Sequence, residues 1–170
     1  MLSLNLHPSS PSPATRIEVE LARVPGGLRL DYHLFGDLNR VRFPGFRPAV
    51  RTDELWKHSC LEAFVGAGDG YYEFNLSPST QWAAYHFDAY RAGMREADIP
   101  DPAVAWAEGR GRATLSATLS LPPDVTGPIG LSAVIEDTSG VRSFWALAHP
   151  PGPPDFHNAA CFAAELPPAG

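Results

Sequence analysis

The segment CLEAFVGAGDGYYEFNL, residues 60–76, predicts the centre of the fold. Two strand-like runs, 60–65 and 71–76, flank the turn-forming stretch GAGDG. Along the second run, more polar and more apolar side chains alternate with a period of two, which is typical of a β-strand. A short glycine-rich connection between two such runs predicts an antiparallel hairpin.

The two faces of the 71–76 strand differ in chemistry. One face is apolar from Tyr72 onward, which predicts contact with the core. The other face presents Glu73 and Asn75, whose hydrogen-bonding groups are not needed in a purely structural strand. We expect a recognition surface there, with Arg91 as a nearby charged donor, although a merely solvated face fits the same pattern.

Strand-like runs recur along the rest of the chain. They cover residues 16–24, 28–36, 113–121, 129–136, 141–148 and 160–166. Gly26 and Gly27 predict a tight turn between the first two of these runs. A helical turn is expected within 87–94, and the Pro- and Ser-rich residues 1–15 predict a loose arm or an irregular edge strand.

Many short strands separated by turns predict an all-β fold, an antiparallel β-sandwich. The 18 prolines lie between the strand-like runs, where they end strands and do not interrupt them. At 170 residues the chain has the length of one domain with a full core. We therefore predict a single sandwich domain over 1–170.

Composition excludes several classes of function. The net charge is −6, and the 13 Lys and Arg residues are scattered, whereas nucleic-acid binding needs clustered basic residues. No apolar stretch approaches the roughly 18 residues of a membrane span, and the N-terminus lacks the pattern of a signal peptide. The partner expected from the sequence is a small molecule, with neither nucleic acid nor a membrane involved; no partner protein is indicated.

Cys60 and Cys161 are the only cysteines, and each lies in an apolar run. Neither has a metal-ligating residue at the close spacing of a zinc site. We expect two buried free thiols and a reducing, cytoplasmic location.

Motifs of common enzymes are absent from the sequence: there is no GxSxG, HExxH, P-loop or dinucleotide fingerprint. Glu62 and Glu73 lie on neighbouring predicted strands. Two such carboxyl groups can act as acid and base on a glycoside, or they can form an ordinary hydrogen-bonded face.

A second dense patch follows in FWALAHPPGPPDFHNAACF, residues 144–162. His149, Asp155 and His157 surround a proline-stiffened loop. They can hold the loop by hydrogen bonds, recognise a ligand, or supply two or three metal ligands. Trp56 precedes a predicted strand and either covers the core or offers a flat face to a sugar.

Three blocks, LWKHSCLEAFVG (55–66), YYEFNLSPSTQWAAYHFDAYRAGM (71–94) and SFWALAHPPGPPDFHNAACF (143–162), resemble the bacterial DOMON-like proteins. These proteins are related to the family 9 carbohydrate-binding modules. The resemblance implies a jelly-roll-like sandwich with a ligand site on or beside one sheet. Thr80 stands where the family pattern favours glycine after SPS.

The resemblance also implies site residues. Family 9 modules clamp a sugar between two tryptophans, and Trp56 and Trp145 match these in order along the chain. The haem-binding branch uses an axial Met and His, for which Met94 and His149 are the candidates. The complete set of expected ligand-binding residues is Trp56, His58, Glu62, Glu73, Asn75, Arg91, Trp145, His149, Asp155 and His157.

The leading hypothesis is a non-enzymatic domain that binds a sugar or a similar small polar ligand without a cofactor or metal. Two alternatives stay open: a haem-binding, electron-transfer domain, and a hydrolase using Glu62 with Glu73 or His149 with Asp155 and His157. We expect Trp56, Arg91, Trp145 and the 149–157 loop to line one cleft at an edge of the sandwich. If the prolines instead fasten a strand crossover, these side chains are buried and bonded to one another.

Overall fold

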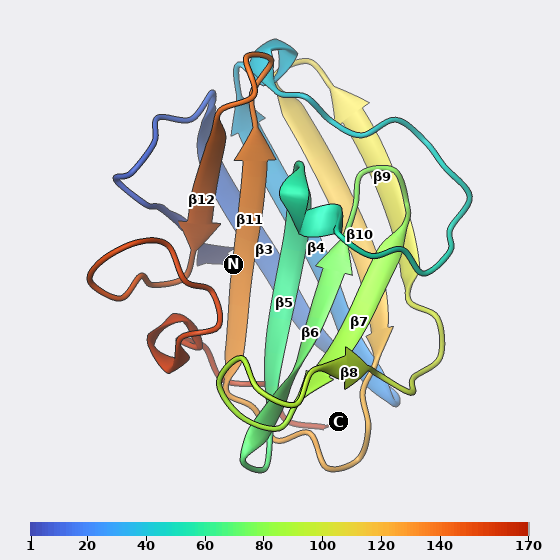
Figure 1. Cartoon of the computed structure of the whole chain (residues 1–170). Helices are drawn as coiled ribbons and strands as arrows, with labels where there is room; N and C mark the ends of the chain where they lie inside the picture. Colours follow the sequence, from blue (N-terminus) through green and yellow to red (C-terminus); the bar gives the residue numbers. More distant parts are fainter. Residues whose placement is uncertain (170) are drawn as a thin grey trace.

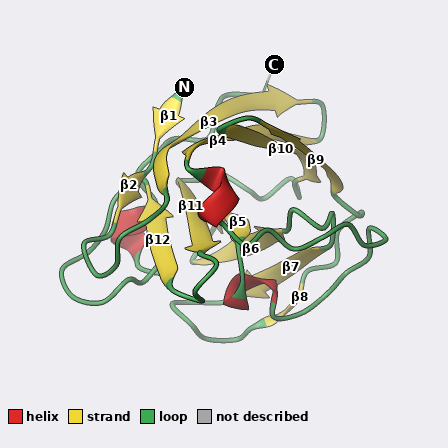
Figure 2. Ribbon diagram, turned by 90° about the horizontal axis from the view of Figure 1, so that it is seen from above, coloured by secondary structure: helices red, strands yellow, loops and turns green. Residues whose placement is uncertain are grey.

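The structure, a computed structural model, describes residues 1–169 and consists of two antiparallel sheets packed face to face (Figures 1 and 2). The five-stranded sheet has the order β1 (Leu2–Ser3), β3 (Ala14–Val24), β4 (Gly27–Gly36), β10 (Arg112–Ser120), β9 (Ala103–Gly109). The seven-stranded sheet has the order β2 (Asn5–Leu6), β12 (Arg142–Ala146), β11 (Ile129–Glu136), β5 (Cys60–Ala67), β6 (Gly70–Leu76), β7 (Trp82–Phe87), β8 (Arg95–Glu96). Three 3₁₀ turns, η1 (Leu38–Arg40), η2 (Leu55–Lys57) and η3 (Ala159–Cys161), complete the elements. The prediction of an antiparallel β-sandwich is confirmed.

Both predicted hairpins are present. β3 pairs with β4 around Gly26, and β5 pairs with β6 around Gly68. These two glycines have φ of 69° and 60°, in the left-handed region that a residue without Cβ adopts at little cost. The turn chemistry thus sets the register of both hairpins.

Four segments differ from the sequence-based expectations, one of them being β7, which was not among the expected strands. Residues 160–166 are not a strand: they contain η3 and a single bridge from Ala164 to Ile129. Residues 87–94 hold no helical turn, because the chain reverses tightly between β7 and β8 and Asp88 N donates to Ala92 O at 2.9 Å. Strand β9 was not expected, since its alternating Ala residues give a weak apolar pattern.

The N-terminal residues form short edge strands on both sheets. β1 pairs with β3, and β2 pairs with β12, so the first six residues join the two layers. Of the two expectations for residues 1–15, the irregular edge strand is therefore correct. Thr80, where glycine was expected, has φ of 76°, and its hydroxyl donates to Arg47 O at 2.9 Å.

One apolar core fills the space between the sheets. Alternate residues of β10, including Leu115 and Leu119, have no exposed surface, as the alternation predicted. Tyr32 on β4 is also fully buried, and its hydroxyl donates across the core to the backbone oxygen of Glu62 on β5 at 2.7 Å. Among residues 1–169, no helix has the length and apolar character required to cross a membrane.

The seven-stranded sheet is also covered on its outer face. Every residue of β5 and β11 is buried, although only alternate residues of each strand face the core. Phe64, Tyr71, Tyr85 and Phe87 form a second, smaller apolar cluster on the outer side. Figure 1 shows the segment after β12, in orange to red, folding back beside this sheet.

Replacing Tyr32 with Phe removes the one hydroxyl that bonds across the core to β5. We expect the free energy of unfolding to fall by about 1–2 kcal/mol, because the buried Glu62 carbonyl loses a donor. Urea denaturation measures the change. The matched control is Tyr72→Phe, since the partly exposed Tyr72 hydroxyl has no hydrogen bond within residues 1–169; an equal loss in both variants contradicts the role assigned to Tyr32.

Candidate ligand-binding site

A cavity of about 490 Å³ lies on the outer face of the seven-stranded sheet. Its floor comes from β5, β6, β7 and β11, and its walls from η2, β12, the turn after β7 and the C-terminal segment. The cavity residues from the expected set are Trp56, Glu62, Glu73, Arg91 and His157.

Glu62 and Glu73 form the polar floor of the cavity. Across the β5–β6 pairing, Glu62 lies opposite Asn75 and Phe64 lies opposite Glu73, so the two glutamates are diagonal neighbours on one face. Glu62 is 3% exposed and Glu73 is 5% exposed. Burial, together with the neighbouring Glu73 charge, raises the pKa of Glu62 well above its ordinary value, and the 3.5 Å bond from the Ser132 hydroxyl opposes this only in part.

Asn75, another residue of the expected set, is not among the residues that line the cavity. It lies opposite Glu62 on the same face of the sheet and has no exposed surface. Neither its amide oxygen nor its amide nitrogen has a hydrogen-bond partner among residues 1–169. A buried amide without partners costs roughly 1–3 kcal/mol in folded proteins, so this face of the sheet keeps hydrogen-bonding capacity that the protein itself does not use.

A chain of hydrogen bonds ties the C-terminal segment to the floor. The backbone N–H of Arg91 donates to the Tyr71 hydroxyl at 3.2 Å, and this hydroxyl lies 2.8 Å from Nδ1 of His157. Nε2 of His157 lies 3.3 Å from a carboxylate oxygen of Glu73. Both ring nitrogens of His157 therefore have a polar partner, the Tyr71 hydroxyl at Nδ1 and Glu73 at Nε2.

Arg91 and Asp155 close the rim between the β7–β8 turn and the C-terminal segment. The Arg91 guanidinium donates to Asp155 at 2.8 Å, and the Tyr90 hydroxyl donates to the other carboxylate oxygen. Burial acts to raise the Asp155 pKa, but these two partners outweigh it and lower the pKa. Asp155 therefore fixes the cavity wall and is not itself part of the lining.

Aromatic side chains form most of the remaining wall. Trp56 on η2 is 47% exposed, and Phe144 of β12 packs near Phe156, with ring centroids 6.1 Å apart. Tyr85 stands on the floor and donates its hydroxyl to Asp53. Burial and this bond raise the pKa of Tyr85, so it remains a neutral phenol.

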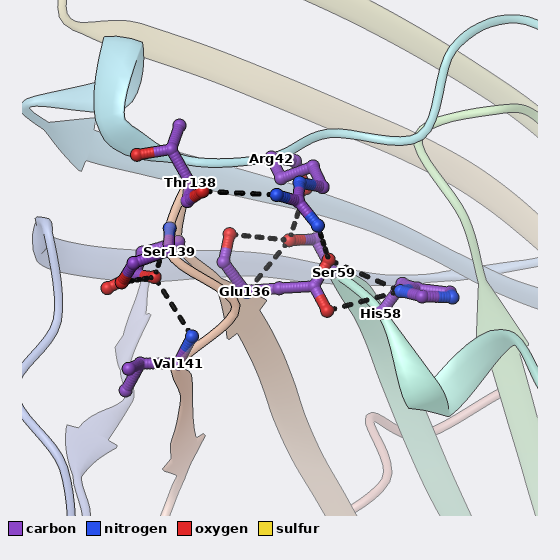
Figure 3. A network of polar contacts seen from close by, with 8 residues as sticks. Arg42, His58, Ser59, Glu136, Thr138, Ser139 and Val141 are labelled. Atoms are coloured by element: carbon purple, nitrogen blue, oxygen red, sulfur yellow. Dashed lines mark hydrogen bonds and ion pairs between the residues drawn. The ribbon is translucent and has the colours of Figure 1, made fainter.

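A polar network beside the cavity holds η2 on the sheet (Figure 3). Glu136, at the end of β11, lies 3.2 Å from Nδ1 of His58 and 3.7 Å from Arg42. The Ser59 hydroxyl donates to Arg42 O at 2.8 Å and accepts from the backbone N–H of Glu136 at 2.9 Å. His58 thus bonds Glu136 and does not line the cavity.

The prediction that Trp145 lines the cavity as a second tryptophan beside Trp56 is wrong. Trp145 is 4% exposed, packs in the core between the sheets, and donates its indole N–H to Ser12 at 3.3 Å. Its neighbour Phe144 points to the opposite face and lines the cavity. On β12 the cavity is therefore lined by Phe144, one residue before the tryptophan that was expected there.

His149 is also outside the cavity. Its Nε2 lies 2.7 Å from the backbone oxygen of Asn5, and its ring packs edge-on against His7 with centroids 5.0 Å apart. Burial lowers its pKa. His149 therefore fastens the N-terminal residues to the proline loop, which is the structural alternative considered for that loop.

These positions test the two alternative hypotheses, haem binding and hydrolysis. Met94 lines the cavity and His149 does not, so the residues proposed for haem are not brought together. His149, Asp155 and His157 do not form one catalytic group either. Within residues 1–169, no group of three His, Cys, Asp or Glu side chains is arranged to hold a metal ion.

Cys60 and Cys161 are both buried free thiols.

Several lining residues were not identified from the sequence. They are Phe64, Tyr85, Phe87, Val134, Arg142 and Phe144, whereas Met94 was expected only as a haem ligand, and Pro154 and Phe156 only as members of the 149–157 loop. Tyr85 and Phe87 follow from the period of two once β7 is paired in register with β6, because Tyr85 lies opposite Glu73. The lining by Phe156 depends on how the C-terminal segment folds back, for which the sequence gives no local signal.

No protein-family model matches the chain, and no curated protein matches it significantly in sequence. Solved structures are similar in fold. A protein of Bacteroides uniformis, provisionally named as carbohydrate-binding, aligns with a TM-score of 0.56 at 14% identity over 86% of this chain and 76% of its own. A family 9 carbohydrate-binding module (CBM9) of Caldicellulosiruptor kristjanssonii in complex with cellotriose aligns with a TM-score of 0.52 at 11% identity, over 89% of this chain and 75% of that one.

A CBM9 of the same organism in complex with glucose aligns with a TM-score of 0.50 at 11% identity, over 85% of this chain and 72% of that one. At these identities the likeness shows a shared fold. The structural neighbours of this chain are thus carbohydrate-binding proteins, CBM9 among them.

Replacing Asp155 with Ala removes the bonds that fix the wall to Arg91 and Tyr90. We expect amide hydrogen exchange in 155–162 to accelerate by roughly three- to tenfold at neutral pH, a modest effect because Arg91 is half exposed. The Asp155 pKa is lowered in the folded state, so its stabilising contribution is present above about pH 4 and is lost as the pH falls through the lowered pKa.

The matched control is Asp101→Ala, since Asp101 is exposed and its carboxylate has no hydrogen bond within residues 1–169. Exchange mass spectrometry at neutral and strongly acidic pH measures both variants. Equal protection of 155–162 in the two variants at neutral pH contradicts the assigned role.

Proposed function

We propose that this chain is a non-enzymatic carbohydrate-binding domain that holds one sugar residue or the end of a short saccharide in the cavity. The observation that carries the proposal is the composition of the cavity. Two buried carboxyl groups, those of Glu62 and Glu73, lie beside aromatic faces in a space whose volume is typical of small-molecule sites. Sugars need both features, because their C–H groups pack on aromatic rings and their hydroxyls require donors and acceptors.

The comparisons support the proposal at the level of fold. The CBM9 structures contain cellotriose and glucose, which are the kinds of ligand we propose for this chain. Membership of the DOMON-like proteins, a jelly-roll topology and a cytoplasmic location belong to the same proposal and rest on the sequence. Trp56 is the aromatic platform in this account, with Phe144 in place of the second tryptophan.

A second candidate, glycoside hydrolysis, is favoured by one observation. Glu62 and Glu73 both line the cavity, and the raised pKa of Glu62 resembles that of a general acid. Incubation with chromogenic aryl glycosides separates the two functions. A hydrolase releases the chromophore and loses this activity in Glu62→Gln, whereas a binding domain releases none while still binding the corresponding sugar.

Replacing Trp56 with Ala removes the exposed aromatic face of the cavity. We expect affinity for a bound monosaccharide or disaccharide to fall by roughly tenfold or more, because the ring supplies contact with the C–H groups of the sugar. Isothermal titration calorimetry against a panel of neutral and charged sugars measures the change. Phe46→Ala is the matched control, since Phe46 is 80% exposed and lies outside the lining.

Two results contradict the proposal. One is the absence of binding by the folded wild-type protein across the whole panel. The other is an equal loss of affinity in Trp56→Ala and Phe46→Ala, which would mean that the sugar does not bind in the cavity.

A further inference from the structure

Glu62, on the floor of the cavity, has no basic side chain beside its carboxyl group within the described residues. Glu62 is 3% exposed, and no Lys, Arg or His nitrogen among residues 1–169 lies within 4 Å of its carboxylate. Its nearest polar partner is the Ser132 hydroxyl at 3.5 Å. A buried carboxyl without a cation is costly, so such groups mark sites where a ligand supplies the missing partner.

Glu73, the second carboxyl group of the floor, has one basic neighbour. Nε2 of His157 lies 3.3 Å from its carboxylate, and Nδ1 of the same ring lies 2.8 Å from the Tyr71 hydroxyl. Within residues 1–169, Glu62 and Glu73 thus have one imidazole beside the pair, which leaves a place for the positive charge of a ligand.

The two arginines of the cavity do not neutralise this floor. Arg91 is already paired with Asp155 at 2.8 Å. Arg142 lies opposite Glu136 on β11, whereas Glu62 lies opposite Ser132. Four residues of strand separate these two positions on β11, which is roughly 13 Å along the sheet.

Aromatic rings flank the charged floor. In register across β5, β6 and β7, Phe64 lies opposite Glu73 and Glu73 lies opposite Tyr85, so the carboxylate stands between two rings. Phe87 and Trp56 also line the cavity. Aromatic faces combined with carboxylates are suited to an organic ammonium, which gains both cation–π and ionic contacts where water is excluded.

We infer that the ligand is an amino sugar, whose ammonium group lies over Glu62 and Glu73 between Phe64 and Tyr85. The inference rests on the proposed function, because it assigns a chemical class to the saccharide of the same cavity. The hydroxyls of the sugar then face the Trp56 side of the cavity. A neutral sugar makes the same hydroxyl contacts and leaves the carboxyl pair without its cation.

The test is calorimetric titration of the full chain at pH 6 with glucosamine, glucose, N-acetylglucosamine and glucuronate. The N-acetyl sugar retains the ring and blocks the ammonium, so it isolates the effect of the charge. We expect glucosamine to bind at least tenfold more tightly than glucose and N-acetylglucosamine, and glucuronate to bind more weakly than glucose.

Substitution of the carboxyl groups gives the matched comparison. Glu62→Gln keeps the shape of the side chain and removes its charge, and we expect the ratio of glucosamine to glucose affinity to fall to about one. Glu73→Gln is the second variant, in case the first does not fold. Glu20→Gln removes the same charge from the opposite sheet, where Glu20 is exposed, and is expected to keep the preference.

Proton release provides an independent readout. Burial and Glu73 raise the pKa of Glu62, so binding of an ammonium favours loss of the Glu62 proton. Titrations in buffers of different ionisation enthalpy are expected to show release of up to about one proton per bound glucosamine. Glucose is expected to release none.

The outcomes separate this inference from the proposed function. If glucose binds and glucosamine binds no more tightly, or glucuronate binds best, the amino-sugar inference is overturned and carbohydrate binding stands. If no sugar of any charge binds to the folded protein, both fail. Retention of the glucosamine preference in both Glu62→Gln and Glu73→Gln also overturns the inference.

Discussion

The hydrogen-bonded chain from Arg91 through Tyr71 and His157 to Glu73 is the interaction on which the cavity depends. It joins the β7–β8 turn, strand β6 and the C-terminal segment, which are far apart in sequence. Without it the outer face of the seven-stranded sheet would be open to water. With it, β5 and β11 are buried on both faces, and the charged groups between them lie in an environment of low polarity.

This arrangement lowers the stability of the fold and leaves polar groups available to a ligand. The unpartnered amide of Asn75 and the isolated carboxyl of Glu62 both oppose folding, because each gives up water without gaining a full set of partners. The adjacent aromatic cluster offsets part of that cost, with Tyr71 stacked on Phe87 at a centroid distance of 4.9 Å and Phe64 packed against His157 at 5.1 Å. Buried polar groups without a full set of partners occur most often at functional sites, and here they lie on the face of the sheet that carries the cavity.

Sequence reasoning identified the sandwich because alternation survives wherever one face of a strand meets solvent, as in β3 and β10. It also placed Glu62 and Glu73 on neighbouring strands, and the register of the hairpin puts them on one face. It assigned Trp145 to the site from the family resemblance; β12 is apolar on both sides near its end, so side-chain type does not distinguish its core face from its cavity face. The fold-back of 150–164 depends on contacts with distant residues, which no local pattern encodes.

The most direct test is a nuclear magnetic resonance titration of the labelled protein with glucose and glucosamine, observing the four tryptophan indole N–H signals and the backbone amides. The account predicts that the Trp56 indole signal and the amides of β5 and β6 around Glu62 and Glu73 shift on addition of the sugar. The indole signal of Trp106, on β9 of the opposite sheet, is expected to stay unchanged. Shifts confined to the five-stranded sheet, with the Trp56 signal constant at saturation, would contradict a saccharide site in this cavity.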